Sequence, residues 1–101
     1  MASLFEICME IARVENGLAF GDIQYTYDKL MCAMKPGHPA DILDDIFCDV
    51  GNELFFDHDK EIPKQRVEKL YKDLQEFATA FGVKELDRAI SELQEYIKKM
   101  K

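Results

Sequence analysis

Eight acidic residues and a single lysine lie between Asp41 and Glu61, and the residues best suited to chemistry or recognition are concentrated there. Five of these acids recur at intervals of four residues: Asp41, Asp45, Asp49, Glu53 and Asp57. Carboxylates at this spacing lie on successive turns of a helix, where like charges repel by roughly 0.2–0.5 kcal/mol per pair. Because a fold selected only for stability would place lysines between them, we interpret the stripe as a surface kept for a basic partner.

The charge is segregated along the chain. Residues 1–40 hold five acids and three bases, and residues 62–101 hold seven acids and nine bases. The formal charge of −7 therefore divides into −2, −7 and +2, with the full excess in residues 41–61. An acidic chain disfavours direct binding to nucleic acid or to anionic membranes, both of which reward Lys and Arg. No apolar run approaches the roughly 18 residues of a membrane span, so we expect no membrane insertion.

The predicted partner-binding residues combine the acids with two aromatic side chains. They are Asp41, Asp44, Asp45, Asp49, Glu53, Phe55, Phe56, Asp57 and Asp59. On a helical wheel Phe55 and Phe56 fall among the acids, and an aromatic anchor ringed by charge is typical of a binding hot spot. Tyr25 is a secondary contact candidate.

Plainer interpretations stay open for the same residues. The acids can form an ordinary solvated helix face, in which Asp41, Asp44 and Asp45 complement the helix macrodipole. The two phenylalanines can be covered by the loop that follows them.

A catalytic or metal site is a weaker interpretation. His58 lies between Asp57 and Asp59 and could act as a general base oriented by a carboxylate, but no Ser or Cys stands in a nucleophile motif. The 57–61 run lacks the length, the glycine and the closing glutamate of a calcium loop. The chain has no Glu-x-x-His pair for a di-metal bundle. We therefore expect no enzyme activity, no metal and no cofactor.

The cysteines and the N-terminal residues favour a cytoplasmic protein. Cys8, Cys32 and Cys48 are odd in number and contain no CxxC pair, as expected of core thiols in a reducing compartment. With His38 and His58 they place no ligand pair on a single turn, which argues against zinc. Glu6 and Glu10 interrupt the first apolar residues and no basic segment precedes them, so we expect no signal peptide.

Hydrophobic periodicity predicts an all-α chain. The predicted helices cover residues 4–16, 20–34, 39–56, 63–81 and 84–99. A Ser3–Glu6 capping box opens the first helix, and Asn16-Gly17 is expected to stop it. Pro39 suits the first turn of the third helix, Pro63 opens the fourth, and Gly82 suits a left-handed cap. Gly51, in the middle of the third helix, disfavours a continuous helix there.

The second helix is expected to bury one apolar face, made of Phe20, Ile23, Tyr27, Leu30, Met31 and Met34. Alternating Val/Ile/Thr-rich runs are missing from the sequence, so no sheet is expected. The fold predicted for residues 1–101 is a single domain, an antiparallel four- or five-helix bundle.

Some of these segments resemble those of a known protein class. They are a short first helix, a second helix entered through Gly17-Leu18-Ala19-Phe20, an acid-flanked third helix ending in Glu53-Leu54-Phe55, and a helix from Val67 to Phe77. In these features and in its acidic composition the chain resembles bacterial toxin-immunity proteins, most closely the helical immunity proteins of the colicin D type. Pore-directed pediocin-type immunity proteins are also helical, but they tend towards basic composition.

The resemblance implies a cytosolic inhibitor that protects a cell from its own bacteriocin or contact-dependent toxin. Its carboxylates would occupy a groove that a cationic nuclease domain offers to RNA phosphates. An alternative is a phage- or host-encoded mimic of nucleic acid, or an acidic helical adaptor that binds another basic protein. The sequence leaves the oligomeric state open.

Overall fold

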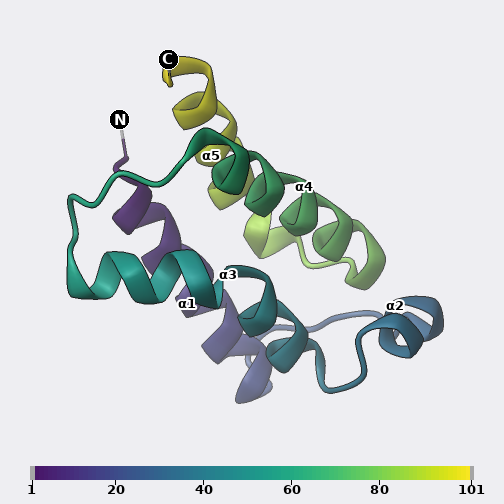
Figure 1. Cartoon of the computed structure of the whole chain (residues 1–101). Helices are drawn as coiled ribbons and strands as arrows, with labels where there is room; N and C mark the ends of the chain where they lie inside the picture. Colours follow the sequence, from purple (N-terminus) through teal and green to yellow (C-terminus); the bar gives the residue numbers. More distant parts are fainter. Residues whose placement is uncertain (1, 101) are drawn as a thin grey trace.

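A computed structural model describes residues 2–100 and is built from helices (Figure 1). The elements are α1 (Leu4–Ala19), α2 (Lys29–Met34), α3 (Pro39–Phe56), α4 (Lys64–Phe81), the 3-10 turn η1 (Lys84–Leu86) and α5 (Asp87–Lys99). No strand occurs in these 99 described positions, 2 to 100. The all-α prediction is confirmed.

The first helix begins as predicted and ends later. Glu6 N donates to Ser3 Oγ at 3.1 Å, and Ser3 N donates to Glu6 Oε1 at 3.3 Å, which completes the capping box. The expected stop at Asn16-Gly17 is wrong, because α1 continues to Ala19. Gly17 instead lets the chain fold back closely: a Cβ there would lie 2.5 Å from Ile23 Cδ1. The amides of Asp22 and Ile23 both donate to Gly17 O, at 2.8 and 3.0 Å.

The second helix is much shorter than the predicted 20–34. Only Lys29–Met34 is helical, and it starts where the Asp28 side chain accepts a hydrogen bond from Met31 N at 2.7 Å. The preceding residues are drawn into other contacts, because Thr26 N donates to Phe81 O at 2.7 Å, at the end of α4. This tertiary hydrogen bond and the Asp28 cap outweigh the helical periodicity of the segment.

The expected burial of the second helix is also wrong. None of the residues of α2 is buried. Of the six side chains predicted to form its apolar face, Ile23 and Met31 are half-buried and the rest are exposed.

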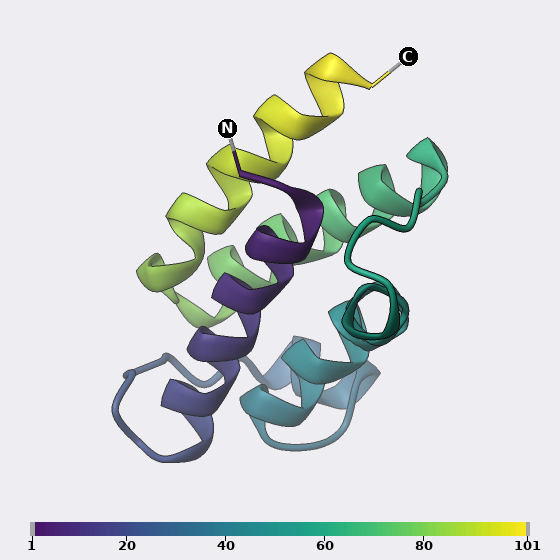
Figure 2. The same cartoon turned by 90° about the vertical axis from the view of Figure 1, so that its left-hand side faces the viewer.

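The third helix has the predicted bounds. Pro39 occupies its first turn, and His38 caps it, since His38 Nδ1 accepts from Ala40 N at 3.1 Å. Gly51 does not interrupt the helix, but it is buried, and a Cβ there would approach the Phe47 ring to 3.1 Å. Figure 2 shows the last turns of α3 almost end-on while its first turns run across the view, so the helix bends along its length.

The C-terminal half follows the prediction closely. Pro63 directly precedes α4, and Gly82 caps it in the left-handed conformation with φ 63°. The last segment begins as η1 and continues as α5 to Lys99.

One hydrophobic cluster joins the four long helices. α1 packs against α3 and α5, and α4 packs against α5 and α3. The cluster contains no buried polar side chain among residues 2–100. Within it Phe77 and Phe81 are fully buried, with ring centroids 4.9 Å apart. α2 stands at one end of this body (Figure 1).

Candidate functional site: the acidic face of α3

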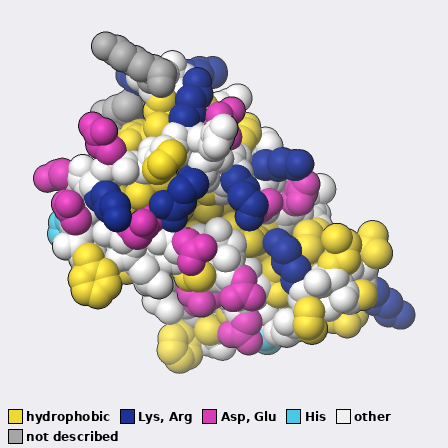
Figure 3. Space-filling model, viewed as in Figure 1, with side chains coloured by type: hydrophobic (Ala, Val, Ile, Leu, Met, Phe, Trp, Pro, Cys, Tyr) yellow, Lys and Arg dark blue, Asp and Glu magenta, His cyan; other side chains and the backbone are white. Residues whose placement is uncertain are grey.

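The exposed face of α3 carries the predicted acids because its opposite face is held in the core. Ile42, Leu43 and Leu54 are at most 1 % exposed. Four carboxylates therefore point to solvent, those of Asp41, Asp44, Asp45 and Asp49. Figure 3 shows Asp and Glu side chains gathered beside a band of Lys and Arg side chains. This arrangement raises the question of which acids the protein already neutralises itself.

Glu53 is neutralised within the chain. Its Oε1 lies 3.1 Å from Lys60 Nζ, and its Oε2 lies 2.6 Å from an Arg66 guanidinium nitrogen. These two cations hold the pKa of Glu53 below its ordinary value, Arg66 having the larger effect. Glu53 thus ties the end of α3 to the following loop and to α4. The prediction from the sequence treated Glu53 as a free carboxylate available to a partner. In the structure Glu53 instead forms ion pairs within the chain.

Asp49 is an intermediate case, close to cations of α4 but not paired with them. It lines a small hollow between α3 and α4 together with Arg66 and Lys69, and its charge helps to raise the pKa of Arg66. Neither cation comes within 4.0 Å of its carboxylate. Asp49 is therefore exposed, in the field of α4 cations, without a direct ion pair.

Asp41, Asp44 and Asp45 have no such compensation. Within residues 2–100, no Lys, Arg or His nitrogen lies within 4.0 Å of their carboxylate oxygens. Asp41 lies in the first turn of α3, where the macrodipole favours negative charge by about 0.3–1 kcal/mol, and Asp44 and Asp45 lie in the second turn. We call Asp41, Asp44 and Asp45 the acidic face from here on.

A fourth acid, not predicted from the sequence, joins the acidic face from α1. Glu15 is half-buried beside Asp44 and Asp41. Burial, then the charge of Asp44 and a hydrogen bond shared with its carboxylate, then the charge of Asp41, raise the pKa of Glu15 to about 7. Nothing around Glu15 in the sequence signals this, because the contact exists only once α1 packs on α3.

The two predicted aromatic anchors, Phe55 and Phe56, differ in their exposure and in their contacts. Phe56 is 95 % exposed and Phe55 is 44 % exposed. Phe55 packs edge-on against Phe5 of α1 with ring centroids 5.9 Å apart, and His58 stacks on the same Phe5 ring at 3.9 Å. Phe55 thus belongs to a small aromatic cluster, and Phe56 stands free.

The remaining predicted residues lie in the loop after α3. Asp57 caps the helix C-terminus and its Oδ1 accepts from Asp59 N at 3.2 Å, a local turn contact. The Asp59 side chain is exposed. Tyr25, the secondary candidate, is 38 % exposed, and its hydroxyl lies 3.3 Å from His38 Nε2.

His58 has no carboxylate partner among the residues that the structure describes. In the described part of the chain, no carboxylate oxygen lies within 4.0 Å of its ring nitrogens. Across residues 2–100, no cluster of three or more His, Cys, Asp or Glu side chains is arranged to hold a metal ion.

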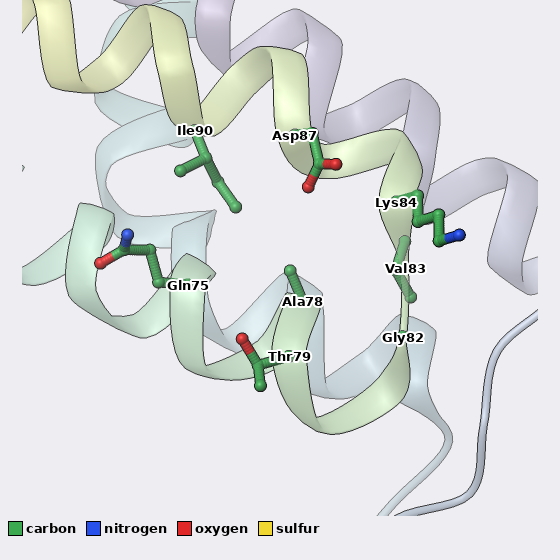
Figure 4. Close-up of a pocket in the computed structure, with 8 residues that line it drawn as sticks. All are labelled: Gln75, Ala78, Thr79, Gly82, Val83, Lys84, Asp87 and Ile90. Carbon is green, nitrogen blue, oxygen red and sulfur yellow. The ribbon is translucent and has the colours of Figure 1, made fainter.

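A separate hollow lies where α4 ends and α5 begins (Figure 4). It measures about 340 Å³, and its polar lining includes Gln75, Thr79, Lys84 and Asp87. Its lining residues include neither His nor Cys.

Comparisons with known proteins identify no relative. The chain matches no protein-family model, no curated protein and no solved structure. The resemblance to immunity proteins therefore stays a prediction. Among residues 2–100, no helix combines the length and the apolar composition needed to cross a membrane.

Proposed function

We propose that this protein is an acidic inhibitor of the immunity type, which binds a basic protein and blocks it without turnover. The observation that carries the proposal is the acidic face, three exposed carboxylates to which residues 2–100 offer no cation within 4.0 Å. The same chain pairs Glu53 with two cations. Within residues 2–100, the absence of cations beside the acidic face is thus a local feature, because the chain does pair an acid with Lys and Arg elsewhere.

Crowding at Glu15 supports a cationic partner. Three carboxylates from two helices meet there, and one of them holds its proton up to about pH 7. A Lys or Arg brought beside Asp44 would favour the ionised form of Glu15. Binding would then release a proton near neutral pH, which gives the proposal a signature beyond affinity.

Phe56 supplies an apolar contact at the other end of α3. Asp45 and Phe56 are eleven positions apart in one helix, or about 16 Å measured along its bent axis at 1.5 Å per residue. The partner surface would therefore present cations and, at a distance of no more than about one and a half nanometres, an apolar recess. Long-range attraction would speed the encounter, and the desolvated aromatic ring would slow dissociation.

A nucleic-acid-binding protein is the class of partner that fits best. Acids four residues apart rise about 6 Å along a helix and make a row of negative charge. Lys and Arg arranged for a nucleic-acid backbone can meet such a row. A toxin nuclease domain is the specific partner that the resemblance to immunity proteins implies, and a nucleic-acid mimic or an acidic adaptor is the alternative.

The experiment begins with capture of the partner from cells that carry the gene, followed by binding kinetics with the purified partner. The test variant is Asp44→Asn combined with Asp45→Asn. The control is Glu68→Gln combined with Glu76→Gln, which removes the same charge from exposed positions of α4. We expect the test variant to lose at least about tenfold in affinity and the control to lose little.

Three further readouts identify the mode of action. The association rate should fall steeply with added salt, because screening weakens the attraction between opposite charges. If the partner is a nuclease, one equivalent of this protein should abolish its activity. Calorimetry in buffers of different ionisation enthalpy should show proton release. Equal binding by the test and control variants would show that the acidic face is not the site.

A further inference from the structure

Four large apolar side chains remain uncovered between the end of α1 and the end of α2. Phe20, Tyr27, Leu30 and Met34 are 81, 63, 73 and 73 % exposed, respectively. Figure 3 shows hydrophobic side chains gathered at the right-hand end of the molecule, where Figure 1 places α2. An apolar surface of this kind on a small protein usually marks an interface. These residues lie within residues 20–35, which we call the α2 segment.

The α2 segment is anchored to the body by its backbone and by Tyr25. Thr26 N donates to Phe81 O, and the Tyr25 ring lies edge-on to Phe81 and to His38. The Asp28 side chain caps α2. These contacts fix the segment in place while its large apolar side chains face solvent, so the surface is presented on a defined support.

The charges of the α2 segment are arranged in two halves. Residues 20–28 contain Asp22 and Asp28 and no base, and residues 29–35 contain Lys29 and Lys35 and no acid. The segment is neutral within a chain of charge −7. Asp28 is occupied as the cap of α2, so the complementarity rests on Asp22 and Lys35. A copy of the same segment laid across it about a two-fold axis places Asp22 of each copy opposite Lys35 of the other. An anionic membrane, by contrast, would be repelled by the rest of the chain.

We propose that the protein forms a two-fold symmetric dimer through the α2 segment. Phe20 and Tyr27 of one copy pack against Leu30 and Met34 of the second copy. Asp22 faces Lys35 of the second copy, and the same contact recurs across the axis. The acidic face lies outside the α2 segment, so this inference does not rest on the proposed inhibitor function.

Truncating the apolar side chains tests the interface. Sedimentation velocity from low to high micromolar concentration should show a monomer–dimer equilibrium for the wild type. Leu30→Ser combined with Met34→Ser should raise the dissociation constant at least about tenfold. Since both side chains are 73 % exposed, the fold should persist, and thermal unfolding checks this. Phe56→Ser is the matched control: this side chain is 95 % exposed but lies outside the segment, so self-association should not change.

Charge reversal tests the two-fold register. Asp22→Lys alone and Lys35→Asp alone should each weaken self-association, because each places like charges opposite one another. Mixed in equal amounts, the two variants should form a mixed dimer, in which both contacts pair opposite charges again.

Four results would overturn the proposal. The wild type could stay monomeric throughout the concentration range, or it could assemble beyond a dimer. The truncated variant could dimerise as well as the wild type. The segment could instead bind phosphatidylcholine vesicles while the protein stays monomeric in solution, which would assign the surface to a lipid bilayer.

Discussion

At the scale of single residues, the local surroundings decide which carboxylates remain free. Asp44 and Glu53 both lie on α3, yet Glu53 faces two cations and Asp44 faces another acid. The neighbouring helix makes the difference. α4 offers Arg66 to the end of α3, whereas α1 offers Glu15 to its beginning. A residue's charge alone therefore does not say whether it serves the fold or a partner.

Glu15→Gln should stabilise the protein in alkaline solution. The folded pKa of Glu15 is about 7, above its ordinary value of 4.5, so folding takes up a proton between these values and stability falls as pH rises through that window. Glutamine stays neutral and removes this penalty. After allowance for solvent screening, we expect a gain of about 1 kcal/mol in unfolding free energy at about pH 8.

Urea unfolding across the pH range measures the effect of Glu15→Gln. The gain should disappear at about pH 4, where Glu15 is protonated in both the folded and the unfolded state. Glu76→Gln, at an exposed position of α4, is the control and should show no such dependence. A gain that does not change with pH would contradict the shared proton.

Glu53→Gln should act in the opposite direction. The folded pKa of Glu53 is lowered by Arg66 and Lys60, so its contribution to stability is present above the unfolded value and is lost as pH falls through the folded one. We expect a lower urea midpoint near neutral pH and a smaller difference in acid or at high salt. Partner affinity should change less than it does for Asp44→Asn. An effect confined to binding would contradict the internal role.

At the scale of elements, the ends of helices are set by contacts that periodicity does not contain. α1 runs past Gly17, and the missing Cβ of this residue lets Ile23 pack closely against the helix. The residues before α2 are not helical, because Thr26 N donates a hydrogen bond to Phe81 O at the end of α4. His38 joins two of these elements, capping α3 through Nδ1 and meeting Tyr25 through Nε2.

His38→Ala should lower the free energy of unfolding by about 1 kcal/mol, the usual cost of losing an N-cap. His38→Asn should recover most of this loss, as asparagine is a good N-cap residue. Chemical denaturation of both variants measures the difference. Tyr25→Phe separates the two roles of the histidine, because it removes only the hydroxyl contact at Nε2. Equal stability of the alanine and asparagine variants would show that the cap contributes nothing.

At the scale of the whole molecule, one apolar core supports two surfaces of different character. The acidic face lies on the first turns of α3, and the exposed apolar side chains lie on the α2 segment. The core itself contains Cys8, which is fully buried, whereas Cys32 and Cys48 are half-buried. Burial raises the pKa of the Cys8 thiol to about 12.

Thiol labelling should therefore report on unfolding of the whole protein. The thiolate is the reactive species, so Cys8 should label only when the core opens, while Cys32 and Cys48 label in the folded state. A variant with Cys32→Ser and Cys48→Ser isolates the Cys8 signal. The free energy derived from its labelling rate should equal that from urea unfolding. Labelling of Cys8 faster than global unfolding would indicate local opening of α1.

Most helix boundaries were predictable because they depend on local chemistry. Ser3 with Glu6, Pro39, Pro63 and Gly82 act within one turn of the chain, and the structure has them where the pattern placed them. The α2 segment was not predictable in this way. Its apolar residues have helical spacing, but spacing does not say whether another element is available to cover them.

The sequence by itself thus determined the all-α fold class and the segregation of charge, since both follow from residue types and their spacing. Only the tertiary structure decided which acids are free, because it brings Arg66 to Glu53 and Glu15 to Asp44. It also decided that the α2 segment faces solvent. The physical reason is the same in both cases: ion pairs and burial depend on distances between residues that are remote in the chain.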